Sequence, residues 1–234
     1  MIESFVPAAS TYASDIDFVF DLIFWLVMVF WFVLTEGIFI WLILRFRKKP
    51  GVGAQYITGE LKSEKRWITM PHAAVLLCDI AILYFAVTVW YEVKQRLPEP
   101  QQTVRVIGQQ WAWSFVHPGA DGKLDTEDDI KTVDELHVMV DTFYHFKLES
   151  RDVLHSFSVP VFRLKQDAIP GRVITGWFKP IMTGTYDIQC VEICGIGHGY
   201  MPAKIVIETP EQHAAWVAER SATQIAANAT QAGE

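Results

Sequence analysis

The chain has 234 residues, of which 51% are hydrophobic, and a formal net charge of −7. The negative charge and the lack of a patch rich in lysine and arginine argue against a nucleic-acid-binding protein. The length suits one or two domains, and two long apolar runs lie within the first 91 residues. We therefore expect a membrane anchor followed by a water-exposed domain.

The two apolar runs cover residues 18–44 and 68–91. Each is longer than the roughly 20 residues that an α-helix needs to span a bilayer. Aromatic residues of the kind enriched at membrane interfaces flank the second run: Trp67, Trp90 and Tyr91. Residues 1–100 are thus predicted to form a transmembrane helical hairpin.

The loop between the two runs holds seven Lys or Arg residues and two Glu. Positively charged loops stay in the cytoplasm, so both termini are predicted to lie on the outer side. The first 17 residues hold no Lys or Arg and do not match a signal peptide. We expect a multi-pass protein of a bacterial-type inner membrane, with its C-terminal domain on the periplasmic side.

Three ionisable residues fall at membrane depth: Glu36, His72 and Asp79. Such groups are costly in hydrocarbon, so they are expected to face a protein partner or a hydrated cavity. Two roles stay open for them, hydrogen bonding to another subunit and proton handling. Both roles imply partners within the membrane.

From Gln101 onward the sequence changes to short runs of alternating hydrophobicity, separated by turns that contain Gly and Pro. Seven runs are predicted to be strands: residues 103–107, 111–116, 136–140, 143–148, 173–178, 185–189 and 203–207. Several short strands with regular turns indicate a β-sandwich or Greek-key barrel over residues 101–210. Residues 211–222 favour a short helix, and the remainder, up to residue 234, is predicted to be disordered.

Four residues with metal-binding side chains lie within a stretch of twelve: Cys190, Cys194, His198 and Met201. Soft sulfur ligands combined with imidazole are typical of copper electron-transfer sites. Two thiolates exceed what a mononuclear blue-copper centre uses, so we predict two thiolates that bridge two copper ions. A disulfide between Cys190 and Cys194 is the alternative. Cys78 lies in an apolar run and is expected to act as a small hydrophobic residue.

His155 stands 35 residues before Cys190, in the segment Asp-Val-Leu-His-Ser-Phe. A β-sandwich can bring a histidine on one loop to a cluster on another loop, as in cupredoxin-type sites. His155 is therefore predicted to complete the ligand set. The other histidines of this domain are expected to be surface or packing residues: His117, His137, His145 and His213.

The pattern Cys-x-Glu-x-Cys-Gly-x-x-His-x-x-Met of residues 190–201 resembles subunit II of the haem-copper cytochrome c oxidases. The helical hairpin, Trp111-Ala-Trp113, the segment around His155 and Lys-Gln-Asp-Ala-Ile-Pro-Gly of residues 165–171 share this resemblance. It implies a cupredoxin-like domain with a dinuclear copper centre, CuA, that passes electrons from cytochrome c to haem in subunit I. Oxygen would be reduced to water in that subunit, with coupled proton pumping, and subunit III would be a further partner.

The resemblance also implies the ligand set of the copper centre. Two thiolates would bridge the coppers, two imidazoles would bind one copper each, a thioether would bind weakly and a backbone carbonyl would complete the set: Cys190 and Cys194, His155 and His198, Met201, and Glu192. The Glu192 side chain would in addition bind Mg²⁺ at the interface with subunit I, since magnesium prefers oxygen ligands.

Further roles follow from the same resemblance. Trp111 matches the residue that receives electrons from cytochrome c, although Ala112 departs from the usual Trp-Tyr-Trp. A core role is the alternative, and it applies better to Trp113. Glu64 matches the glutamate at the cytoplasmic mouth of a proton channel into subunit I, with a solvated surface acid as the alternative. Two residues match a segment near the subunit I interface and are interpreted as docking residues: Asp167 and Arg172.

Three other functions share parts of these features. A copper subunit of a nitric oxide reductase is the alternative. A quinol oxidase subunit is rejected because all copper ligands are present, and a copper carrier is disfavoured because it needs an open, exchangeable site. No Cys-x-x-Cys-His motif occurs, so the cytochrome c donor is expected to be a separate protein.

Residues 121–135 contain seven acidic residues and two lysines. Three interpretations stay open for this acidic segment. It can steer a basic cytochrome c, form a merely solvated hairpin, or bind calcium. The match to a calcium loop is weak because the early ligand positions fall on His117 and Gly119.

Overall fold

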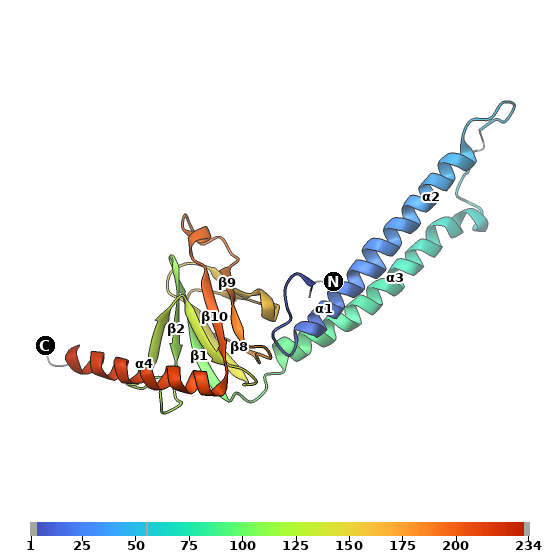
Figure 1. Ribbon diagram of the computed structural model, residues 1–234. Helices are drawn as coiled ribbons and strands as arrows, with labels where there is room; N and C mark the ends of the chain where they lie inside the picture. Colours follow the sequence, from blue (N-terminus) through green and yellow to red (C-terminus); the bar gives the residue numbers. More distant parts are fainter. Residues whose placement is uncertain (1–3, 55, 232–234) are drawn as a thin grey trace. The chain divides into compact units, whose positions relative to one another are not determined.

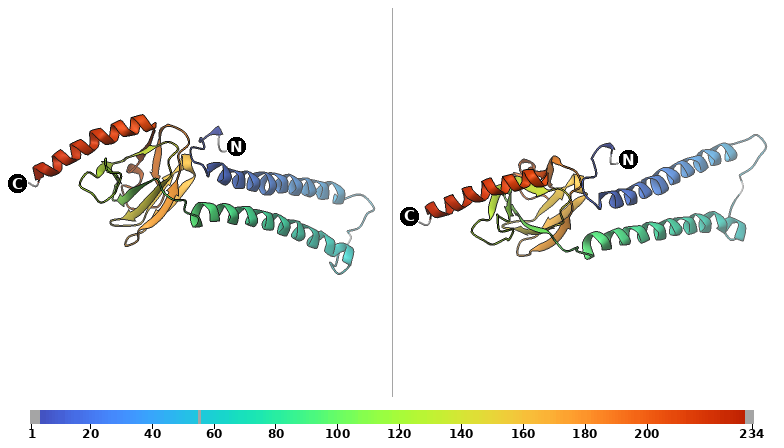
Figure 2. Two further views of the ribbon diagram at one scale, coloured as in Figure 1. Left: turned by 90° about the horizontal axis from the view of Figure 1, so that it is seen from below. Right: turned by 60° about the horizontal axis from the view of Figure 1, so that its bottom comes forward.

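A computed structural model describes residues 4–54 and 56–231. These residues form two compact units, shown in Figures 1 and 2. One unit is Asp15–Tyr91, and the other combines the N-terminal segment up to Ser14 with the chain from Glu92 onward. The N-terminal segment thus belongs with the C-terminal domain, whereas the sequence assigned it to the hairpin.

The first unit is a hairpin of two long helices, which run side by side in both figures. The first helix consists of α1 (Ala13–Leu22), a π-helical turn (Ile23–Val29) and α2 (Phe30–Phe46), and the second of α3 (Lys62–Trp90) and a π-helical end (Tyr91–Gln95). Both 34-residue helices are long and apolar enough to cross a membrane. They include the predicted spans and extend beyond them, because helical hydrogen bonding continues into the polar flanks.

The second unit is a β-sandwich of ten strands. Its strands are β1 (Gln102–Gln109), β2 (Ala112–His117), β3 (Ile130–Val133), β4 (Glu135–Met139), β5 (Tyr144–Ser150), β6 (His155–Val159), β7 (Leu164–Ala168), β8 (Ile174–Phe178), β9 (Gly184–Cys190) and β10 (Ala203–Glu208). One sheet has the order β3-β2-β1-β5-β8 and the other β4-β10-β9-β6-β7. The predicted fold class, a helical hairpin followed by an all-β sandwich, is confirmed.

All seven predicted strands exist, with ends that differ by at most two residues, but β3, β6 and β7 were missed. β3 has only four residues and lies within the acidic segment. β7 carries Lys165, Gln166 and Asp167 at its centre, and it lies at the edge of its sheet, where polar side chains reach solvent. β6 begins at His155, so this histidine lies on a strand and not on the expected loop.

Aromatic side chains from both sheets fill the space between them. Phe157 of β6 contacts Trp113 of β2 and Phe146 of β5, with ring centroids 5.6 Å and 5.8 Å apart. All three are fully buried, and removing such a ring from water contributes about 2–3 kcal/mol. Gly176 of β8 lies opposite Phe146 in the ladder, and a Cβ atom there would overlap the Phe146 ring. This core makes the sandwich a rigid support for the loops at its end.

Residues 5–12, which we call the N-terminal strap, run along the sandwich. The Ala9 N–H donates to the Val161 carbonyl at 2.8 Å, and the Ala9 carbonyl accepts from the Ile181 N–H at 2.9 Å. The Ser10 hydroxyl donates to the Phe162 carbonyl at 3.1 Å. The strap therefore satisfies backbone groups of the sandwich that no strand pairs.

The C-terminal helix α4 (Pro210–Gln231) contacts β3, β4 and β10. Trp216 stacks on His137 of β4, with ring centroids 4.3 Å apart and 10° between the planes. The predicted short helix 211–222 with a disordered tail differs from this result, because helix formation continues to Gln231 through residues such as Ala and Gln that favour helices. Residues 232–234 lie outside the described part of the chain.

Candidate metal centre

The sandwich positions the predicted metal ligands through two neighbouring strands. His155 is the first residue of β6 and Cys190 the last residue of β9, and the two strands pair antiparallel with Phe157 opposite Cys190. After Cys190 the chain forms a loop, residues 190–201, which we call the metal loop. It carries Cys194, His198 and Met201 and ends two residues before the start of β10. The ladder thus fixes one histidine and one cysteine, and the metal loop supplies the other ligands.

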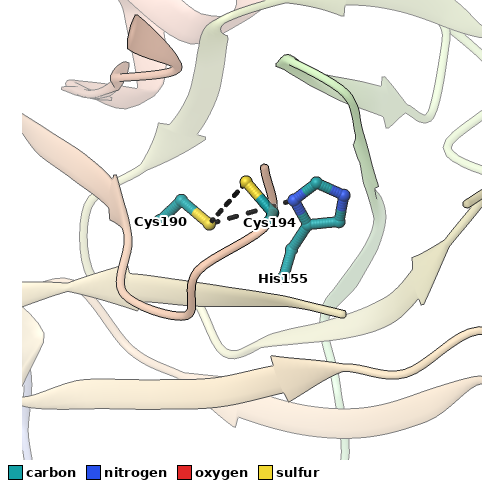
Figure 3. A group of neighbouring side chains, drawn as sticks. All are labelled: His155, Cys190 and Cys194. Atoms are coloured by element: carbon teal, nitrogen blue, oxygen red, sulfur yellow. Dashed lines mark hydrogen bonds between the residues drawn. The ribbon is translucent and has the colours of Figure 1, made fainter. Parts of the chain in front are cut away.

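The side chains of these residues converge. Figure 3 shows the imidazole of His155 beside the thiols of Cys190 and Cys194, and the ligand atoms of these three residues lie within 4.8 Å of one another. The contacts are 3.9 Å for Cys190 Sγ to Cys194 Sγ, 3.9 Å for Cys190 Sγ to His155 Nδ1, 3.6 Å for Cys194 Sγ to His198 Nδ1, 3.4 Å for Cys194 Sγ to Met201 Sδ, and 3.4 Å for Cys190 Sγ to the Glu192 carbonyl oxygen. Every predicted copper ligand is therefore present at one place.

The two cysteines are free thiols. Their sulfur atoms are 3.9 Å apart, whereas a disulfide bond requires about 2.0 Å. The disulfide alternative is thus not the arrangement found. Sulfur atoms at this separation leave room for metal ions between them.

The ring of His155 is oriented from behind by Asp152. Its Nε2 atom lies 2.8 Å from Asp152 Oδ1, and Asp152 Oδ2 accepts the backbone N–H of Gln110 at 2.7 Å. When Nε2 carries the proton for this bond, Nδ1 presents its lone pair to the thiols, as in metal sites where a carboxylate orients a histidine. Partial burial opposes ionisation of Asp152, but the hydrogen bonds from Gln110, His155 and Val153 outweigh it and lower the pKa of this carboxyl.

The centre is largely shielded from water. His155, Cys194 and Met201 are buried, with exposed fractions of 0%, 3% and 1%. Burial and the neighbouring Cys190 thiol raise the pKa of Cys194 to about 11. A metal that binds here therefore displaces a proton from the thiol. Two thiols, two imidazoles and a thioether form a soft donor set that fits copper.

Trp111 and Trp113 have different environments. Trp111 is 39% exposed, and its ring lies against Gly195 and Gly197 of the metal loop. Trp113 is fully buried in the core, with its ring centroid 6.0 Å from that of His155. The tryptophan singled out from the sequence is thus the one that reaches from the surface to the metal loop.

Two residues of this region were missed in the sequence: Gln110 and Asp152. The side-chain amide of Gln110 donates to the Cys194 carbonyl at 2.8 Å. Asp152 has a local signal, because it precedes His155 by only three residues in the segment Asp-Val-Leu-His-Ser-Phe. Gln110 carries no signal in one sequence, since its role depends on a contact with a residue 84 positions away.

The remaining predicted site residues have other partners. The Glu192 carboxylate lies 3.2 Å from Lys165 Nζ, so its side chain forms an ion pair at the edge of the metal loop. The Asp167 carboxylate accepts the Ser156 hydroxyl at 2.8 Å. Glu64 lies in the first turn of α3, in the helical unit. Its carboxylate accepts, at 2.9 Å, the backbone N–H of Gly59, which precedes the helix.

The acidic segment folds through its own carboxylates. Asp128 accepts the Thr126 hydroxyl at 2.7 Å, Asp129 accepts the Asp125 N–H at 2.9 Å, and Asp125 pairs with Arg105 at 2.6 Å. Within the described residues, His155, Cys190 and Cys194 form the one group of His, Cys, Asp or Glu placed to share a metal ion. The calcium interpretation gains no support from this arrangement.

Comparison with known proteins places these features in context. Residues 102–209 match the family described as cytochrome c oxidase subunit II, periplasmic domain. The chain is 32% identical over 229 residues to alternative cytochrome c oxidase subunit 2 of Bradyrhizobium diazoefficiens, which covers 88% of this chain and 80% of the relative. It is 29% identical over 243 residues to cytochrome c oxidase subunit 2 of Cereibacter sphaeroides, covering 91% of this chain and 78% of the relative.

The crystal structure of the periplasmic domain of subunit II of cytochrome oxidase from Bradyrhizobium japonicum aligns with a TM-score of 0.49 and 29% identity. The alignment covers 55% of this chain and 99% of that domain.

Proposed function

The chain belongs to the cytochrome c oxidase subunit II family, and from this premise we propose that it is the subunit through which electrons enter the oxidase. Its exported domain would hold a dinuclear copper centre, CuA, which supplies one-electron transfer from cytochrome c to a haem of subunit I. Reduction of oxygen to water and the coupled proton pumping belong to that partner subunit. The relatives are named as cytochrome c oxidase subunits, so the nitric oxide reductase alternative is not favoured.

One observation carries this proposal, the convergence of five sulfur- and nitrogen-bearing side chains on one end of the sandwich: His155, Cys190, Cys194, His198 and Met201. Cys190, Cys194, His155 and His198 would hold the copper ions of the proposed centre. Met201 and the carbonyl of Glu192 would complete the ligand set.

The protein contributes a rigid and partly buried environment to this chemistry. The β6–β9 ladder holds His155 and Cys190 in register, and Asp152 holds the His155 ring. A ligand set that is fixed before the electron arrives needs little rearrangement, and this favours fast electron transfer. Trp111 is proposed as the residue where electrons enter, because it is partly exposed and also touches the metal loop.

Membrane partners are supported by the hairpin. Within the described chain, no residue of the most apolar 18-residue stretch of either helix is buried. Glu36 and Asp79 are also exposed on these helices. Subunit I is the proposed partner of these surfaces, with subunit III as a further neighbour. The Lys- and Arg-rich loop supports an orientation with the sandwich on the periplasmic side of the inner membrane.

Two further roles remain proposals. The Glu192 carboxylate is a candidate Mg²⁺ ligand at the subunit I interface, provided that it leaves its ion pair with Lys165. Glu64 is a candidate for the mouth of a proton channel, although its bond to the Gly59 N–H also explains it as a turn-capping residue.

Copper stoichiometry and electron transfer test the proposal together. The purified full-length chain should bind two coppers, and its electron paramagnetic resonance spectrum should show one spin coupled to both nuclei. Cys194→Ser should abolish oxidation of reduced cytochrome c by the assembled oxidase, because it removes a bridging ligand. Cys78→Ser is the matched control, since this third free cysteine lies in the helical unit, and it should leave both properties unchanged. One copper per chain, or normal turnover of Cys194→Ser, would refute the dinuclear relay.

A further inference from the structure

The turn between β1 and β2 is joined to the metal centre from two sides. The Gln110 backbone N–H donates to Asp152 Oδ2 at 2.7 Å, and Asp152 Oδ1 lies 2.8 Å from Nε2 of His155. The Gln110 side-chain amide donates to the Cys194 carbonyl at 2.8 Å. Gln110 is thus connected both to the histidine on β6 and to the cysteine on the metal loop.

The next residue, Trp111, lies on a surface made by two glycines of the metal loop. A Cβ atom at Gly197 would overlap the Trp111 ring, and one at Gly195 would lie 2.9 Å from the Gln110 amide nitrogen and 3.2 Å from the Trp111 ring. The backbone of Gly197 has an ordinary φ of −89°, so the space taken by Trp111, and not the backbone, requires glycine there. The indole therefore touches the metal loop directly.

From these contacts we propose that Gln110 is a positioning residue that holds Trp111 against the metal loop. Gly197 leaves the space that the Trp111 ring occupies. This inference rests on the proposed function, because it concerns the delivery of electrons to the same centre. One electron from reduced cytochrome c would pass through Trp111 to the copper pair when it is bound, with no bond made or broken. Gln110 acts by holding the contact between Trp111 and the loop, and it does not bind copper.

A positioning role predicts a different outcome from a docking role or a purely structural role. A residue that contacts cytochrome c changes the KM for cytochrome c when it is replaced. A residue that only supports the fold changes the copper content and the spectrum. Loss of the contact between Trp111 and the metal loop instead lowers the rate of electron transfer within the bound complex, while KM and copper content stay the same.

The first test is Gln110→Leu in the assembled oxidase, with the rate of copper reduction measured at saturating reduced cytochrome c. We expect about a fivefold slower rate, the factor that one ordinary hydrogen bond makes in an equilibrium constant. Gln109→Leu is the matched control, since Gln109 is the adjacent glutamine and its side chain bonds to Arg151 and not to the metal loop. This control should keep the wild-type rate.

The second test fills the space at Gly197 that the Trp111 ring occupies and leaves the hydrogen bonds of Gln110 unchanged. Gly197→Ala should displace the Trp111 ring and slow the same step at least as much as Gln110→Leu. Gly199→Ala is its control, because a Cβ atom at Gly199 meets nothing within 4 Å. In a Trp111→Ala background, Gln110→Leu and Gly197→Ala should cause little further loss, since both are inferred to act through Trp111.

Wild-type rates in both Gln110→Leu and Gly197→Ala would overturn the proposal. So would a raised KM with an unchanged rate at saturation, or full additivity with Trp111→Ala. Copper content and the two-nucleus spectrum of the wild-type chain are measured in parallel. If the wild type lacks the copper pair the proposed function fails, whereas an intact pair with unaffected variants overturns only the role of Gln110.

Discussion

At the scale of single residues, Asp152 shows how a side chain outside a metal centre can organise it. One carboxylate oxygen faces His155 and the other accepts the N–H of Gln110. The same group therefore sets which nitrogen of the imidazole is free and where the β1–β2 turn begins. An amide in its place could accept one of these hydrogen bonds but would need to turn its donor toward the other partner.

His117 gives a prediction about pH at this scale. It is buried, its Nε2 accepts the His137 N–H at 3.0 Å, and burial lowers its pKa from 6.5 to about 3. The unfolded chain therefore takes up a proton before the folded chain does. Stability from this group is complete above pH 6.5 and is lost as the pH falls toward 3, by about 1.4 kcal/mol per unit, or about 2 kcal/mol at pH 5.

His117→Gln removes this titration while leaving a hydrogen-bond acceptor. We expect its free energy of unfolding to fall less between pH 7.5 and pH 5 than that of the wild type. Chemical unfolding of the solubilised chain, followed by tryptophan fluorescence, measures the difference. Equal losses in the two proteins would show that His117 does not titrate in this way.

At the scale of elements, the pairing of β6 with β9 matters most for the centre. Successive residues of a strand face opposite sides of a sheet, so a slip of one residue would turn His155 away from the thiols. Phe157 opposes Cys190 in the ladder and is buried in the core between Trp113 and Phe146. The packing of the core therefore holds the register that the ligands need.

Helix α4 provides a prediction at this scale. Its contact with the sandwich depends on Trp216, which stacks on His137, whereas Glu219 of the same helix is exposed. Trp216→Ala should lower the free energy of unfolding by about 2 kcal/mol, through lost aromatic contact and burial. Glu219→Ala should have almost no effect. Thermal unfolding of both variants checks this, and equal melting temperatures would show that Trp216 does not hold the helix.

The sequence was sufficient to predict the helical hairpin, the sandwich and the six residues that meet at the metal loop, because apolar length, strand alternation and residue spacing are local signals. Other features depend on contacts between distant segments. Polar β7 is a strand because it pairs with β6, Gln110 matters because the metal loop passes over it, and Glu192 pairs with a lysine 27 positions away. A pattern within one segment cannot show such partners.

At the scale of the whole molecule, the orientation in the membrane gives a further prediction. The loop between the two helices holds most of the positive charge of the hairpin. An epitope inserted after Gly51 should therefore react with antibody only after the inner membrane is permeabilised. An epitope added after Glu234 should react in intact spheroplasts. The reverse result would overturn the assignment of the sandwich to the periplasmic side.

The N-terminal strap places a condition on biosynthesis. It precedes the first helix, yet it supplies partners for Val161, Phe162 and Ile181, which follow both helices in the chain. In the proposed orientation, the strap and the sandwich cross the membrane in separate translocation events. The sandwich can complete its hydrogen bonds only after both have arrived, so export of the strap is a step in the folding of the sandwich.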